Sequence, residues 1–166
     1  MKFSILIPVY NAEQYIENCV NGVLRQQADE IEIVLVDDGS TDESGTICDR
    51  LAESFPQTVR VIHQKNQGQL AARMAAADQA TGEYCLFLDA DDELAEGCLL
   101  ELSGLIEKYD QPDLIVYSFR YIYEDGSEKP AKKIASGERY YSDLRELREQ
   151  FFSGTLLNSV CTKLIK

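Results

Sequence analysis

The 166 residues include 29 acidic and 16 basic side chains, which gives a net charge of −13 at pH 7. This acidic surplus disfavours nucleic acid or an anionic lipid surface as the main partner, because both are polyanions. The five cysteines are odd in number and form no CxxC pair, so neither a disulfide framework nor a zinc site is predicted and a reduced, cytoplasmic protein is indicated.

Apolar runs alternate with amphipathic segments along the first two thirds of the chain. We expect strands at 3–9, 31–36, 59–63 and 84–88, and helices at 13–27, 43–55, 70–80 and around 99–109. The strands are apolar on both faces and the connections are short, which predicts an α/β domain with a mostly parallel sheet covered by helices. No apolar run approaches the ~20 residues of a membrane span. Peripheral attachment at the inner face of a membrane, through residues beyond Lys166, is left open.

The character of the sequence changes after Pro112. The run 114–123 is rich in aromatic and β-branched residues and is followed by Asp125-Gly126, a turn signal that predicts a hairpin. A further helix is expected over 143–152. We therefore interpret the chain as one domain with two regions, 1–112 and 113–166, of which the second adds a hairpin or other antiparallel element.

Three of the predicted strands end in polar clusters, at 8–11, 37–40 and 89–92. The carboxyl ends of parallel strands meet at one edge of a sheet, and open α/β sheets bind their ligands there. The five acids of these clusters then need a cation, shifted proton equilibria or many hydrogen-bond donors. Mg²⁺ or Mn²⁺ takes carboxylate and phosphate oxygens, and one or two protein carboxylates suffice when a diphosphate supplies other ligands.

Helix capping is the alternative explanation for polar residues at these positions. For the acids at 37–38 and 89–91 this alternative stays open. The residues that we assign chiefly to helix starts are the spaced pairs Asn11 with Gln14 and Ser40 with Glu43, together with Asp42, Asp92 and Glu93.

Four segments in order, PVYN, VDDGSTD, Asn66-x-Gly68 with Arg73 soon after, and GEYCLFLDADD, resemble those of the family 2 inverting glycosyltransferases. The resemblance covers about residues 3–100. It implies a Rossmann-like, type A glycosyltransferase fold in which 1–112 bind a nucleoside diphosphate sugar and 113–166 form a truncated acceptor-side region. The implied reaction is metal-dependent transfer of a sugar, UDP-linked in many members, with inversion to the hydroxyl of a saccharide, lipid-linked or protein-linked acceptor, as in cell-wall or polysaccharide biosynthesis.

Roles for individual residues follow from the same resemblance. Pro8 and Tyr10 are expected to line the nucleobase pocket, and Asp38 to hydrogen-bond the base. Asp89 is expected at the ribose or metal side, Asp91 as the ligand of Mn²⁺ or Mg²⁺, and Arg73 as a counter-charge near the nucleotide. No residue of 114–166 is identified as the general base.

Three other functions are weighed against the same residues. A truncated domain that binds nucleotide sugar without turnover fits the same motifs. A Mg²⁺-dependent receiver domain needs an acid pair after its first strand, where PVYN stands, and a dinucleotide oxidoreductase needs a glycine-rich turn there. The single histidine, His63, is interpreted as a local hydrogen-bonding residue rather than a catalytic base.

Overall fold

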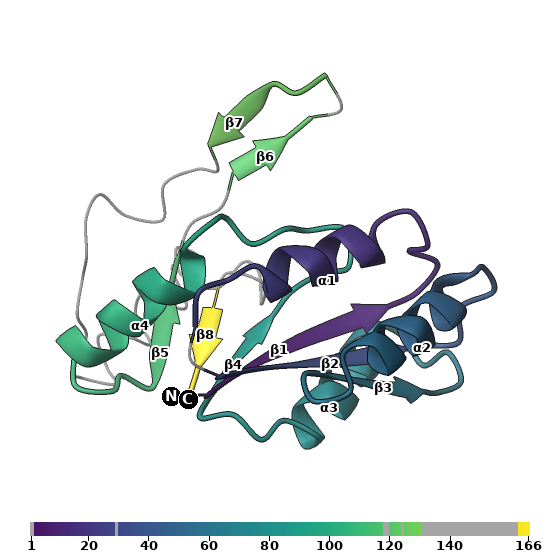
Figure 1. Ribbon diagram of the computed structural model, residues 1–166, viewed down its shortest axis with the longest axis horizontal. Coiled ribbons are helices and arrows are strands. Elements are labelled where there is room, and N and C mark those ends of the chain that lie inside the picture. Colours follow the sequence, from purple (N-terminus) through teal and green to yellow (C-terminus); the bar gives the residue numbers. More distant parts are fainter. Residues whose placement is uncertain (1, 29, 118–119, 124, 131–162) are drawn as a thin grey trace.

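The computed structural model describes residues 2–28, 30–117, 120–123, 125–130 and 163–166 (Figure 1). Within them, a six-stranded sheet has the order β3-β2-β1-β4-β8-β5. Its strands are β1 (Lys2–Val9), β2 (Glu30–Asp37), β3 (Val59–His63), β4 (Tyr84–Phe87), β5 (Leu114–Val116) and β8 (Lys163–Ile165). β1 is parallel to β2 and β4, and β2 is parallel to β3, whereas β8 is antiparallel to both β4 and β5. The predicted mostly parallel α/β sheet with an antiparallel addition is confirmed.

Among the described residues, four helices cover the sheet: α1 (Ile16–Leu24), α2 (Ser44–Ser54), α3 (Gln69–Asp78) and α4 (Cys98–Lys108). Side chains alternate across β1, so Phe3, Ile5 and Ile7 pack in one core with α1, α2 and α4, while Leu6 packs in a second core with α3. No helix in the described part of the chain is long and apolar enough to cross a membrane.

Helix α3 lies close to the sheet because its buried contacts are alanines. Ala72 and Ala76 are fully buried against Leu6, Val34 and Val36. A larger side chain at either position would push the helix outward. The alanines therefore also set the position of the first turn of α3, which borders the pocket described below.

The predicted hairpin is present, but its first strand is shorter than expected. The run 114–123 divides into β5, which joins the main sheet, and β6 (Arg120–Ile122), which pairs with β7 (Glu128–Pro130). The turn between them contains Gly126 at φ 77°, and the amide of Tyr123 donates to the Ser127 carbonyl. Figure 1 shows this hairpin projecting away from the main sheet. The helix expected over 143–152 lies outside the described residues, and the division at 112/113 stays a prediction.

Most of the expected helix caps are wrong. Helices α1 and α2 begin at Ile16 and Ser44, and the residues directly before them, Tyr15 and Glu43, make no side-chain capping bond. Asp42 does have the expected role, because its carboxylate accepts a hydrogen bond from the Ser44 amide at the start of α2 at 3.0 Å. Helix α4 begins only at Cys98, so Asp92 and Glu93 are not helix-start residues. The physical reason is that capping spacing is a local signal, whereas Asn11 and Ser40 bind partners about 30 residues away, across two loops.

At the amino end of the strands, Glu32 is a buried charge surrounded by donors. Its side chain is 7% exposed and pairs with Arg60 at 2.7 Å and with Lys2 at 3.3 Å. It also accepts hydrogen bonds from the Ser4 hydroxyl, from the backbone and hydroxyl of Thr81, and from the Gly82 amide. Burial alone would raise the pKa of Glu32, but the bonds from Ser4 and Thr81 lower it from 4.5 to about 2. This carboxylate joins β1, β2, β3 and the connection before β4.

Candidate functional site

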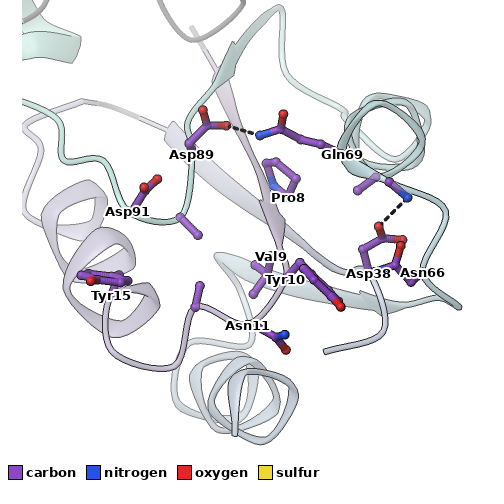
Figure 2. Close-up of a pocket in the computed structure, with 14 residues that line it drawn as sticks. Pro8, Val9, Tyr10, Asn11, Tyr15, Asp38, Asn66, Gln69, Asp89 and Asp91 are labelled. Atoms are coloured by element: carbon purple, nitrogen blue, oxygen red, sulfur yellow. Dashed lines mark hydrogen bonds between the residues drawn. The ribbon is translucent and has the colours of Figure 1, made fainter. Parts of the chain in front are cut away.

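A pocket of about 580 Å³ lies at the carboxyl edge of the strands, where sequence analysis placed the ligand edge (Figure 2). This volume is within the range of small-molecule sites. The pocket is lined by the end of β1, by residues that follow β1, β2, β3 and β4, and by the start of α3: Pro8, Val9, Tyr10, Asn11, Ala12, Tyr15, Asp38, Asn66, Gly68, Gln69, Ala72, Asp89, Ala90 and Asp91.

Five of the six predicted site residues line this pocket. Pro8 lies near the end of β1, and Tyr10 is the first residue after it. Figure 2 shows Asp38 on one side of them and Asp89 and Asp91 on the other. The sixth, Arg73, is not among the lining residues but contacts Asp89 from α3. The structure thus brings the six residues together, while their binding roles stay predictions.

Asp38 is buried and organises the loop before α3. Its carboxylate accepts hydrogen bonds from the Gln64 side chain at 2.7 Å, the Gln67 amide at 2.9 Å and the Gly68 amide at 2.8 Å. Gly68 has φ 87°, a conformation that favours glycine. Because a carboxylate has about four acceptor positions, Asp38 keeps about one for a ligand.

Asp89 has the positive partner that the acidic cluster requires. A guanidinium nitrogen of Arg73 lies 2.6 Å from one carboxylate oxygen of Asp89. The side-chain amide of Gln69 donates to the same oxygen at 3.2 Å. The two charged side chains are only 16% and 28% exposed, so solvent screens this pair weakly. On the other side, the Cys19 thiol donates to the Asp89 carbonyl at 3.6 Å. Burial, with the charges of nearby acids, raises the pKa of Cys19 to about 12, so this thiol stays protonated.

Asp91 differs from Asp89 because it is exposed. Its carboxylate accepts no hydrogen bond from any residue that the structure describes, although it borders the pocket. Partial burial and the charges of Asp91 and Asp89 raise the pKa of the adjacent Asp92. Added negative charge is therefore unfavourable here.

The carboxylates of this site fit a hard divalent ion only if other ligands complete its coordination shell. No group of three or more His, Cys, Asp or Glu side chains able to hold a metal occurs within the described ranges. Asp91, with Asp89 beside it, offers carboxylate oxygens of the kind that Mg²⁺ or Mn²⁺ binds when water and phosphate complete the shell. The residues present are compatible with such an ion shared with a ligand.

The loops after β1 and β2 are joined by reciprocal hydrogen bonds, which we call the loop clasp (residues 11–13 and 40–44). The Asn11 side-chain oxygen accepts from the Thr41 amide at 2.8 Å, and the Asn11 amide donates to the Ser40 hydroxyl at 3.1 Å. Further clasp bonds join Ala12 to the Ser44 hydroxyl at 2.7 Å, Glu13 to the Asp42 carboxylate at 3.2 Å and Glu43 to the Glu13 carboxylate at 2.9 Å. The clasp holds Tyr10 and Asp38, which lie one and two residues before its two halves.

Two of the five acids expected to converge do not line the pocket. One is Asp92, and the other is Asp37, which accepts from the Ser40 amide at 3.0 Å and lies 2.9 Å from the nearer ring nitrogen of His63. The other ring nitrogen lies 2.9 Å from Asp49, and these bonds to Asp49 and Asp37 raise the pKa of His63. His63 has the local hydrogen-bonding role that the sequence indicated.

Sequence reasoning missed several residues that line the pocket or hold its wall. Gln64 and Gln67 bind Asp38, and Gln69 binds Asp89. Their signal is the polar run 64–69, of which sequence analysis uses only Asn66 and Gly68. Tyr15 lies in the segment 13–27 that is predicted as a helix, and it is 52% exposed and borders the pocket.

Comparison with known proteins places these features among characterised sequences. The sequence model of glycosyl transferase family 2 matches residues 4–164. Glycosyltransferase GlyG of Streptococcus pneumoniae is 38% identical over 125 residues, which are 75% of this chain and 41% of GlyG. The chain therefore spans less than half the length of this relative.

Solved structures give the same picture. Residues 1–349 of S. aureus TarS match with a TM-score of 0.64 and 32% identity over 70% of this chain, both in complex with UDP and in complex with UDP-GlcNAc. The match covers about a third of TarS 1–349. The mannosyltransferase PcManGT of Pyrobaculum calidifontis, in complex with GDP-Man and Mn²⁺, has a TM-score of 0.55 and 28% identity over 59% of this chain and 30% of its own.

Proposed function

This chain belongs to glycosyl transferase family 2, and from that membership we propose that its pocket binds the nucleoside diphosphate sugar donor of a metal-dependent, inverting glycosyl transfer. The observation that carries the proposal is the asymmetry of the pocket. One end has the buried, hydrogen-bonded Asp38 beside Tyr10, and the other has the exposed Asp91, which accepts no hydrogen bond from the described residues. A base recognised at the first end and a metal-bound diphosphate at the second would use both.

The donor is UDP-linked in this proposal. The complexes of TarS with UDP and UDP-GlcNAc support uridine, since TarS is more similar to this chain than PcManGT is. The GDP-Man complex of PcManGT makes guanosine the alternative. Pro8 and Tyr10 would pack against the base, and the remaining acceptor position of Asp38 would take an N–H of the base. Asp89 would lie toward the ribose and the metal.

The chemistry is displacement at the anomeric carbon. The acceptor oxygen forms a bond to that carbon, the bond to the diphosphate oxygen breaks, and the acceptor proton passes to a general base. A bound Mn²⁺ or Mg²⁺ would offset the charge that develops on the departing diphosphate. Asp91 would hold that ion, while Arg73 keeps Asp89 in place and the loop clasp fixes Tyr10 and Asp38.

The proposal assigns neither the general base nor a particular acceptor. No residue of 114–166 is identified as the base, and most of that region lies outside the described residues. The acceptor stays a prediction as a saccharide, a lipid-linked or a protein-linked hydroxyl. Binding of nucleotide sugar without turnover is the second candidate, because no residue of this chain is assigned as the general base. Hydrolysis of the sugar nucleotide by this chain favours the first candidate, and binding without hydrolysis favours the second.

Calorimetric titration of UDP with and without Mn²⁺ tests the donor site. We expect Mn²⁺ to increase UDP affinity in the wild type. Asp91→Asn should remove this increase, because it removes the negative charge of the carboxylate that binds the metal. Asp78→Asn, which changes an exposed acid at the end of α3, is the matched control. Absence of UDP binding in both conditions refutes the donor site. Tighter binding of GDP than of UDP would make guanine the nucleobase of the donor. An unchanged Mn²⁺ effect in Asp91→Asn moves the metal to Asp89.

A further inference from the structure

Two tyrosines border the pocket at different ends, and only one of them has a place in the proposed function. Tyr10 and Tyr15 each keep 52% of their surface exposed. Figure 2 shows Tyr10 on the side of Asp38 and Tyr15 on the side of Asp91. The pocket thus has an aromatic ring at each end.

The backbone of Tyr15 is held in place. Its amide donates to the Ala12 carbonyl at 2.9 Å, and its carbonyl accepts from the Cys19 amide at 3.0 Å. The next residue, Ile16, is fully buried in the core. Positions 15 and 19 are one helical turn apart and share a helix face, and Cys19 on that face contacts the Asp89 carbonyl. Tyr15 therefore lies near the loop that contains Asp89 and Asp91, on the pocket side that Figure 2 shows.

Neither folding nor capping explains a tyrosine at this position. Its exposure excludes a core role, and it makes no side-chain capping bond to α1. Within the described residues, no group hydrogen-bonds its hydroxyl. What remains is an anchored ring with an apolar face and an available O–H, which suits a ligand that also combines an apolar face with polar groups. A pyranose is such a ligand, because its C–H bonds form flat faces and its hydroxyls project from the rim.

We propose that Tyr15 is a specificity-determining residue that contacts the sugar of the donor, with its ring against a pyranose face. The inference rests on the proposed function, which orients the base toward Asp38 and the diphosphate toward Asp91. The group beyond the diphosphate is then the sugar, and Tyr15 is the aromatic residue at that end. Tyr10 serves the nucleotide and Tyr15 serves the sugar.

Paired titrations separate the two tyrosines. With Mn²⁺ present, the affinity for UDP is compared with that for the most tightly bound of UDP-glucose, UDP-galactose and UDP-N-acetylglucosamine. We expect Tyr15→Ala to weaken the sugar nucleotide about fivefold to tenfold, the size of one aromatic contact, and UDP by less than about twofold. Tyr15→Phe keeps the ring and is expected to retain most of the affinity.

Two controls and a folding check complete the experiment. Tyr10→Ala is expected to weaken UDP and the sugar nucleotide equally, and Leu100→Ala, an exposed apolar residue outside the pocket, to change neither. Thermal unfolding confirms that each variant is folded. Equal loss of UDP and sugar nucleotide in Tyr15→Ala overturns the inference, as does no loss of either. A wild type that binds no UDP refutes the proposed function instead, so the two failures are distinct.

Discussion

Glu32→Gln is the perturbation whose effect the structure defines most closely. Glutamine keeps the size of the side chain but removes its charge, and the amide nitrogen that replaces one oxygen cannot accept a hydrogen bond. The Ser4 hydroxyl and the Thr81 and Gly82 amides already share one carboxylate oxygen, so the amide nitrogen replaces the other oxygen, which accepts from Arg60 and from the Thr81 hydroxyl. Arg60 and Lys2 are 47% and 33% exposed, so their charges stay hydrated and no unpaired cation is buried.

The expected loss can be calculated from the pKa of Glu32. The 7% exposed carboxylate has its pKa lowered from 4.5 to about 2. A shift of this size corresponds to about 3 kcal/mol in the free energy of unfolding at pH 7. Because the folded-state pKa is the lower one, the stabilisation is complete above the unfolded pKa and is lost as the pH falls through the folded value. The difference between wild type and variant should shrink by about 2 kcal/mol between pH 7 and pH 3.

Urea unfolding of both proteins at pH 7, 5 and 3 measures this difference. The matched control is Glu17→Gln, which breaks the exposed pair with Arg50 and should cost less than about 0.5 kcal/mol. A loss below about 1 kcal/mol at pH 7 would show that the donors around Glu32 contribute little. A loss that does not change with pH would show that packing, not charge, is responsible.

Three further changes test other parts of the fold. Asn11→Ala removes two hydrogen bonds of the loop clasp at a residue with φ 49° and should lower stability by about 1–2 kcal/mol and weaken UDP binding; Asn11→Gly, measured by calorimetry and thermal unfolding, isolates the backbone effect. His63→Ala should remove a stabilisation that is complete below pH 6.5, the unfolded pKa, and is lost as the pH rises through the higher folded value, so urea unfolding from pH 5.5 to 8.5 should show a narrowing difference. Gly39→Ala should destabilise the protein, because Gly39 has φ 72° and the added methyl group would lie 2.8 Å from the Asn66 backbone nitrogen. Gly22→Ala in α1 meets nothing within 4 Å and should raise stability by about 0.5–1 kcal/mol. Thermal unfolding measures both variants, and equal shifts of their melting temperatures would contradict this reasoning.

The two ends of the sheet have opposite arrangements of charge. At the amino end, Glu32 is surrounded by donors that complete its hydrogen bonding within the protein. At the carboxyl end, Asp91 is left without a donor from the described residues. The first arrangement stabilises the fold without a ligand, and the second is relieved by a cation. Under the proposed function, donor and metal should therefore raise the stability of the protein.

Local pattern was sufficient for the elements of the sheet and for the edge at which the site lies. The apolar runs at 3–9, 31–36, 59–63 and 84–88 correspond to β1–β4 within one or two residues. An apolar strand followed by polar residues is a signal within one segment of chain. The rule that parallel strands end at one edge then brought Tyr10, Asp38 and Asp91 to a common pocket.

The partners of each site residue were decided by tertiary structure. The pairing of Arg73 with Asp89, the capture of the 64–68 loop by Asp38, and the loop clasp that replaced the expected caps join residues 16–32 positions apart. Tyr15 lies in the predicted helix segment 13–27, and only the packed helix shows that it is exposed and borders the pocket. The sequence by itself thus determined the α/β elements and the ligand edge, since periodicity and strand polarity are local. Which acid pairs with an arginine and which stays exposed at the pocket depend on contacts that form only when the helices pack on the sheet.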